Sequence, residues 1–96
     1  TIKISPRELK PTEAPNETKV QQLEISINQN GYYSSKPIKY YEYDNQKYIV
    51  DGHHRQKAAQ NLGINVYAKP VSDNYFKDRW GKTSEEFINK IKEFSK

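Results

Sequence analysis

The sequence predicts a small α+β domain built on a mixed β-sheet with about three helices. The length of 96 residues suits one domain. Apolar residues switch along the chain between the two-residue spacing of strands and the 3.6-residue spacing of helices. The predicted elements follow the order strand, helix, hairpin, helix, strand, helix. We therefore expect a single domain over 1–96, with a core at 1–72 and a C-terminal loop and helix at 73–96.

The N-terminal third is expected to hold a strand at 1–5, a proline-rich connection at 6–16 and then a helix. Isoleucines alternate with polar residues in the strand, and the first of three prolines stops further pairing. Asn16 is a favourable N-cap, and Gly31 supplies the left-handed conformation that ends a helix. Between them, apolar residues recur on one helical face: Val20, Leu23 and Ile27.

The middle of the chain is expected to form a hairpin, a helix and a strand. Strands at 37–43 and 47–50 are joined by the polar residues 44–46, which is typical of a hairpin. A helix then spans 53–62, with Ala58, Ala59 and Leu62 facing inward and Gly63 as its terminator. Residues 64–71 form the next strand.

The final helix has the clearest pattern. Thr83 and Glu86 have the spacing of a capping box. The apolar residues that follow lie on one helical face: Phe87, Ile88, Ile91 and Phe94.

Composition limits the possible functions. Sixteen Lys and Arg against twelve Asp and Glu give a net charge of +4, which favours a polyanionic partner such as nucleic acid. The absence of cysteine excludes disulfides, thiolate metal sites and a sulfur nucleophile. No apolar run reaches the roughly 18 residues that span a bilayer, so no membrane partner is expected. Because the sequence has no methionine, we expect it to be a segment of a larger protein.

Most of the functional information lies where a strand passes through Gly52 into a helix. A helix start presents free backbone N–H groups and the positive end of the helix dipole, which together bind phosphate. Arg55 adds a cation suited to bidentate phosphate contacts. Lys36 and Lys57 are further candidate phosphate ligands. The imidazoles of His53 and His54 titrate near neutral pH, as general acid–base catalysis requires.

The same residues also have structural interpretations. Asp51 could cap the helix and compete with phosphate for its N–H groups. His53 and His54 are successive residues, whose side chains point about 100° apart on a helix, so both could be surface residues. Arg55 and Lys57 could form a solvated basic face.

The motif Asp51-Gly52-His53-His54-Arg55, with Ala58-Ala59 and Leu62-Gly63 after it, resembles the signature of ParB/sulfiredoxin-like domains. It is most similar to the ParB-like nuclease branch, found at the C-terminal tips of bacterial polymorphic toxins. Asn30-Gly31 and Lys36-Pro37-Ile38 match the helix end and the Pro-Ile strand of that superfamily. The resemblance covers about residues 1–72 and implies the fold predicted above.

Other branches of the superfamily differ at the motif. Sulfiredoxins depend on a cysteine at the position of His53, so sulfiredoxin activity is not expected. Chromosome-partitioning ParB proteins have Glu and Arg where this chain has His53 and His54, and they continue into a DNA-binding region. The superfamily also contains a branch of kinases that phosphorylate serine. The resemblance therefore leaves open that this chain binds a nucleotide as a cofactor.

Our leading hypothesis is a nuclease that hydrolyses phosphodiester bonds of DNA or RNA. The amides near Gly52 and His53, with Arg55, would hold the scissile phosphate, and His53 or His54 would activate water or protonate the leaving oxygen. Asp51 would orient an imidazole or, with His53, hold a divalent ion such as Mg²⁺.

The resemblance further implies the toxic domain of a larger secreted protein, acting in the target-cell cytoplasm and paired with a cognate immunity protein. Two alternatives stay open: a nucleotide-binding phosphotransferase or nucleotide-gated module, and a noncatalytic nucleic-acid binder.

The segment 72–82 interleaves aromatic and basic residues. Bases could stack on the rings while the cations contact phosphates, and the candidate contacts are Lys77, Arg79, Trp80 and Lys82. Alternatively, the rings dock the C-terminal helix. Tyr32 and Tyr33 precede the strand at 37–43, where a loop could line the rim of the phosphate pocket.

Overall fold

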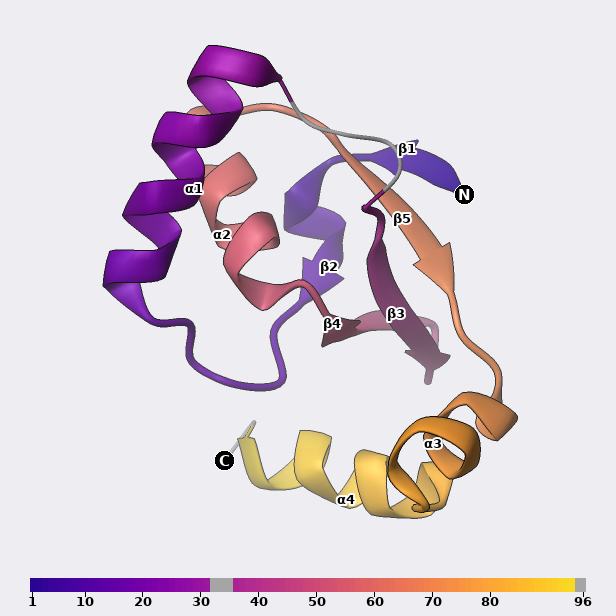
Figure 1. Cartoon of the computed structure of the whole chain (residues 1–96). Helices are drawn as coiled ribbons and strands as arrows, with labels where there is room; N and C mark the ends of the chain where they lie inside the picture. Colours follow the sequence, from indigo (N-terminus) through magenta and orange to yellow (C-terminus); the bar gives the residue numbers. More distant parts are fainter. Residues whose placement is uncertain (32–35, 95–96) are drawn as a thin grey trace.

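The computed structural model describes residues 1–31 and 36–94, and these form a five-stranded sheet with four α-helices (Figure 1). The strands are β1 (Ile2–Ile4), β2 (Leu9–Lys10), β3 (Ile38–Tyr43), β4 (Gln46–Asp51) and β5 (Val66–Pro70). The helices are α1 (Glu17–Asn30), α2 (His53–Leu62), α3 (Asp73–Trp80) and α4 (Ser84–Phe94), with a 3₁₀ turn η1 (Pro6–Glu8).

The sheet is mixed, as the sequence predicts, with the strand order β1-β5-β3-β4-β2. The pairs β1–β5 and β3–β4 are antiparallel, whereas β3–β5 and β2–β4 are parallel. Asp44 and Asn45 connect β3 to β4 with φ angles of 53° and 59°. Asp and Asn tolerate this left-handed conformation better than most residues, which allows a tight hairpin turn.

Each face of the sheet carries its own apolar cluster. Tyr40 and Ile49 belong to the first, and their chain neighbours Tyr41 and Val50 belong to the second, because successive strand residues point to opposite faces. The first cluster includes Leu9, Ile38, Ala59, Val66 and Ala68. The second includes Phe76 from α3 with Phe87 and Ile91 from α4. The helices α3 and α4 therefore cover the face opposite α2.

Local signals place the helix ends correctly. Asn16 Oδ1 accepts a hydrogen bond from the Lys19 amide at 3.1 Å, which caps α1. Gly31 and Gly63 follow α1 and α2 with φ angles of 78° and 71°. Thr83 Oγ1 accepts from the Glu86 amide at 3.3 Å before α4. None of the helices in the described ranges has the length and apolar character needed to cross a bilayer.

Three expectations are corrected. Residues 73–80 form a helix rather than part of a loop; only Phe76 of α3 is buried, so the segment lacks a repeating apolar stripe. The connection 6–16 contains η1 and the two-residue strand β2, which pairs with Lys47 and Tyr48 of β4. Phe94 is 45% exposed instead of lying on the buried stripe of α4.

Candidate functional site

The turn from β4 into α2 places a glycine at the helix start. Gly52 has φ 106° and ψ 25° and occupies the N-cap position, and no side chain in the described ranges caps this helix. Asp51 ends β4, so its alternative role as the N-cap is wrong. The first-turn N–H groups of α2 therefore keep no side-chain acceptor, as an anion site requires.

Gly52 also makes room for Arg55. A Cβ atom at Gly52 would lie 2.9 Å from Arg55 Nη2 and 3.1 Å from Ile38 Cγ1. The guanidinium group therefore packs directly over the glycine, beside the open amides. Glycine is required here for its conformation and for this close approach.

Four predicted site residues line one open pocket of about 420 Å³ at the start of α2: Asp51, Gly52, His54 and Arg55. Three residues of α1 complete it: Lys19, Gln22 and Leu23. His54 and Arg55 are half-buried and Asp51 is exposed. The pocket thus combines helix-start amides with two cations and an imidazole.

Arg55 has unused hydrogen-bonding capacity. Its Nη2 donates to the Pro37 carbonyl oxygen at a long distance of 3.5 Å. Its Nε is buried and has no partner among the residues that the structure describes. A buried guanidinium donor without an acceptor is costly.

His53 lies on the other side of α2, away from this pocket. Its ring is only 6% exposed, and Nε2 accepts a hydrogen bond from the Thr12 amide at 3.1 Å and lies 2.9 Å from Thr12 Oγ1. Its Nδ1 lies 3.6 Å from Glu13 Oε1. The structure therefore does not bring His53, a predicted catalytic and phosphate-binding residue, to the pocket that His54 lines.

The charge state of His53 follows from burial. Desolvation lowers its pKa below the usual 6.5, and the Glu13 carboxylate partly opposes this. The pKa of Glu13 is itself lowered, mainly by a hydrogen bond from Lys90 Nζ at 3.1 Å. His53 is thus a neutral residue that ties the segment 11–13 to the start of α2.

The remaining predicted phosphate ligands are not among the residues that line this pocket. Lys57 lines a separate cavity with His53 and Glu13. Lys36 is exposed ahead of β3 and is not part of the pocket lining. Tyr32 and Tyr33 lie outside the described residues, so the prediction that they line the rim stays a prediction.

The predicted metal pair does not form. Asp51 lines the phosphate pocket while His53 faces Thr12 and Glu13. No cluster of three or more His, Cys, Asp or Glu side chains able to hold a metal occurs within residues 1–31 and 36–94. A Mg²⁺ ion that arrives with substrate phosphates usually needs only one or two protein carboxylates. Asp51 meets that smaller requirement.

The aromatic and basic residues of α3 are divided between structure and surface. Phe76 is fully buried and stacks on Phe87 with ring centroids 4.8 Å apart. This ring therefore packs against the C-terminal helix, which was the alternative to stacking on bases. Lys77 and Arg79 are exposed. Trp80, which is 43% exposed, and Lys82 line a cavity between α3 and α4.

Sequence reasoning missed the contributions of two segments. Lys19 and Gln22 lie three residues apart on the polar side of α1, a common pattern that does not indicate which helix lies beside it. Thr12 and Glu13 sit in the connection 6–16, where no periodic signal exists. Only the packing of α1 on α2 and of the connection on His53 identifies them.

The sequence matches no family model and no curated protein, but solved structures are similar to this one. Sulfiredoxin from Arabidopsis thaliana has a TM-score of 0.65 at 24% identity, over 94% of each chain. A free serine kinase solved with AMP has a TM-score of 0.67 at 26% identity, over 80% of this chain. Chromosome-partitioning ParB from Caulobacter crescentus, complexed with CTP-γ-S, has a TM-score of 0.57 at 16% identity, over 94% of this chain and 69% of that one.

This chain spans about a third of the kinase (32%), so the likeness is to one part of that protein. The chain is a mixed-sheet α+β protein whose second helix begins at a glycine with no side-chain cap. Its fold is similar to those of sulfiredoxin and ParB, which confirms the fold that the motif implied. The nuclease branch stays a prediction.

Proposed function

We propose that the pocket at the start of α2 binds the phosphate groups of a nucleotide and that the chain is a phosphoryl-transfer enzyme. The observation that carries this is that Arg55 lines the pocket beside the uncapped amides of α2. Lys19 supplies a second cation from α1. Helix-start amides and a guanidinium group are the usual partners of phosphate oxygens.

The similar structures support a nucleotide as the source of that phosphate. The free serine kinase was solved with AMP and with ADP, and ParB was solved with CTP-γ-S. These are two different nucleotide-binding proteins on one fold. The absence of a glycine-rich phosphate loop in this sequence is therefore compatible with nucleotide binding.

The pocket residues have distinct roles in such a transfer. The α2 amides and Arg55 hold the phosphate being transferred and neutralise the charge on its oxygens. His54, half-buried at the same pocket, accepts the proton of the acceptor hydroxyl as its oxygen attacks phosphorus and the bond to the leaving phosphate oxygen breaks. Asp51 would hold a Mg²⁺ ion that accompanies the nucleotide, and that ion would supply further neutralisation of phosphate charge.

Calorimetric titration with ADP, ATP and CTP tests the proposal. Replacing Arg55→Ala removes about 2 kcal/mol of charge-assisted hydrogen bonding, so affinity should fall about 30-fold. Lys57→Ala removes a charge from the same helix but outside the pocket, and should change affinity less than about threefold. If none of the three nucleotides binds, or if both variants lose affinity equally, the phosphate site is refuted.

A second candidate is cleavage of DNA or RNA. It is favoured by the openness of the pocket and by the shared presence there of Asp51, His54 and Arg55, three residues of the nuclease-like motif. In this case His54 activates water against a backbone phosphate held by the same amides. Incubation with DNA and RNA, with and without Mg²⁺, should then give products that His54→Ala abolishes. Strongly salt-dependent binding without any product would instead indicate a noncatalytic nucleic-acid binder.

The toxin hypothesis belongs with the nuclease candidate. In it, the chain forms part of a larger secreted protein, acts in the target-cell cytoplasm and is neutralised by a cognate immunity protein. Expression in a bacterial cytoplasm should then arrest growth and fragment chromosomal DNA or transfer RNA, and His54→Ala should be harmless. Growth arrest with intact nucleic acid would favour nucleotide consumption over nuclease action.

A further inference from the structure

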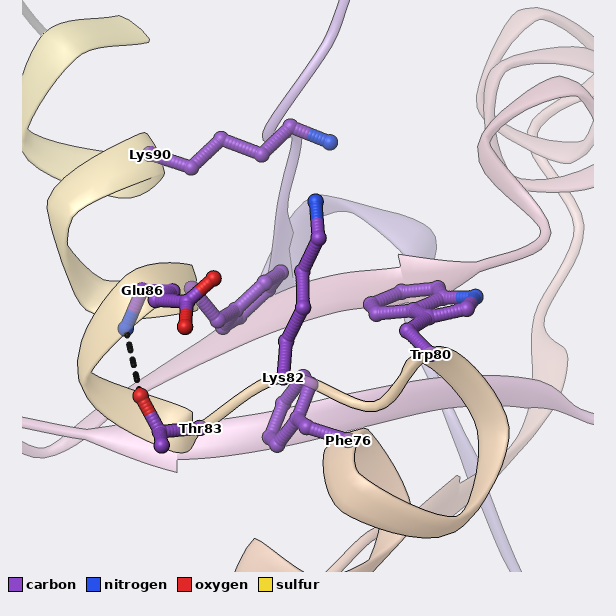
Figure 2. Close-up of a pocket in the computed structure, with 7 residues that line it drawn as sticks. Phe76, Trp80, Lys82, Thr83, Glu86 and Lys90 are labelled. Carbon is purple, nitrogen blue, oxygen red and sulfur yellow. Dashed lines mark hydrogen bonds between the residues drawn. The ribbon is translucent and has the colours of Figure 1, made fainter.

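A cavity of about 600 Å³ between α3 and α4 lies outside the phosphate pocket (Figure 2). Three aromatic and four polar residues line it: Phe76, Trp80, Phe87, Lys82, Thr83, Glu86 and Lys90. It comes from the C-terminal quarter of the chain, whereas the residues of the phosphate pocket come from α1, the end of β4 and the start of α2.

The aromatic side of this cavity leaves one ring available. Phe76 and Phe87 are buried and stack on each other, so their faces are used in packing. Trp80 is 43% exposed, and its indole contacts Phe76 at 5.8 Å and Tyr75 at 5.9 Å between centroids. The Trp80 ring is therefore held in place by protein on one side while it remains accessible to solvent. Such a ring is a ready stacking platform.

The polar side brings two ammonium groups to the same cavity. Lys82 and Lys90 both line it, together with the Glu86 carboxylate. Lys82 has no ion-pair partner in the described part of the chain. Lys90 donates to Glu13 at 3.1 Å, which orients its side chain and leaves further N–H donors. Figure 2 shows Lys82 between Trp80 and Glu86.

We propose that this cavity binds one nucleotide unit, with the base stacked on Trp80 and the phosphate held by Lys82 and Lys90. An aromatic ring beside cations is the arrangement by which proteins hold single-stranded nucleic acid without reading its sequence. A nucleotide unit of this chemistry could come from a free mononucleotide or from a single strand. The site does not depend on the function proposed for the α2 pocket.

Trp80 reports directly on its own site because it is the sole tryptophan of the chain. A stacked base should quench its fluorescence. The probes are a single-stranded oligothymidylate, free thymidine monophosphate, and an abasic deoxyribose-phosphate oligomer of the same length. Quenching by the oligothymidylate alone identifies a nucleic-acid strand as the ligand, and quenching by the monophosphate as well identifies a general nucleotide site. Equal quenching by the abasic oligomer, or none by any probe, overturns the proposal.

Variants separate this cavity from the phosphate pocket. Trp80→Ala should weaken binding of a fluorescently labelled oligothymidylate about tenfold, measured by anisotropy. Lys82→Ala should weaken it about threefold and reduce its salt dependence. Lys92→Ala removes the same charge from the exposed surface of α4 outside the cavity, and an equal loss from it would refute the site. Quenching must persist in Arg55→Ala, since that variant removes only the α2 pocket.

Circular dichroism of each variant establishes that it is folded before its binding is compared. Trp80→Phe keeps an aromatic platform and should retain most of the anisotropy signal, so loss with Trp80→Ala but not with Trp80→Phe assigns the effect to stacking. Equal loss in both folded variants would contradict it.

Discussion

His53 and His54 are adjacent in the sequence and lie in different parts of the molecule. His53 is buried, with Nε2 bonded to Thr12 and Nδ1 facing Glu13. His54 is half-buried in the pocket that holds Arg55. Because successive residues on a helix point about 100° apart, one motif serves two surfaces. Of two adjacent histidines at a helix start, one can therefore have a structural role while the other lies in the functional pocket.

The largest expected effect separates the two histidines by stability. His53→Ala removes a buried ring and leaves the Thr12 amide without its acceptor, so the free energy of unfolding should fall by about 3 kcal/mol. His54→Ala should change it by less than about 0.5 kcal/mol. Urea denaturation followed by circular dichroism measures both. Equal losses would show that the division of roles is wrong.

Gly52→Ala should affect stability and the phosphate pocket together. Alanine would have to adopt the left-handed φ of 106°, and its Cβ atom would lie 2.9 Å from Arg55 Nη2. The free energy of unfolding should therefore fall by about 2 kcal/mol, and nucleotide affinity should fall about tenfold. Urea denaturation and calorimetric titration with ADP measure the two effects.

The matched control for this substitution is Gly63→Ala at the other end of α2. Its φ is 71°, and a Cβ atom there would meet no other part of the described chain within 4 Å, so it carries the conformational cost alone. It should lower stability while leaving nucleotide affinity unchanged. If Gly63→Ala weakens affinity as much as Gly52→Ala, the contact between Gly52 and Arg55 is not what positions the guanidinium group.

Stability should depend on pH through His53. Burial lowers its pKa in the folded state, so the unfolded chain binds a proton more readily. This contribution to stability is present above pH 6.5, the usual value for histidine, and declines as the pH falls from 6.5 toward the lower folded-state pKa. Thermal unfolding at a series of pH values should show the decline, and His53→Gln should flatten it. A decline that persists in that variant would have another cause.

The smallest effect concerns Glu13. Its carboxylate raises the pKa of His53 against the larger effect of burial. Glu13→Gln should therefore lower the pKa of His53 further, and an NMR titration of the imidazole resonances measures it. Because Glu13 is half exposed, its ion pair with Lys90 should add no more than about 0.5 kcal/mol to stability. A rise in the His53 pKa would contradict the assigned contact.

The fold was largely predictable because its signals are local. Asn16, Gly31 and Gly63 act within one helical turn of their own positions, and the hairpin at Asp44 depends on neighbouring residues. The helix α3 was missed because its stability comes from Phe76 packing on α4 and the sheet, a contact between distant elements. Propensity and spacing within 73–80 contain no trace of that partner.

The candidate site was predictable in part for the same reason. Gly52, His54 and Arg55 are neighbours in one motif, so their proximity follows from a single turn. The direction of His53 depends on where the connection 6–16 crosses α2, and the role of Lys19 depends on how α1 packs beside it. These are tertiary contacts, which one sequence without relatives does not encode in any local pattern.

Both edge strands of the sheet, β1 and β2, come from the first ten residues of the chain. β1 pairs through Ile2 with Ala68 at one border of the sheet, and β2 pairs through Leu9 with Lys47 at the other. This short stretch is synthesised before the rest of the domain, yet β1 can complete its pairing only after residue 68 has been synthesised. Folding of the domain should therefore be slow for its size. Its last step should be the pairing of the N-terminal strands with the two sides of the sheet.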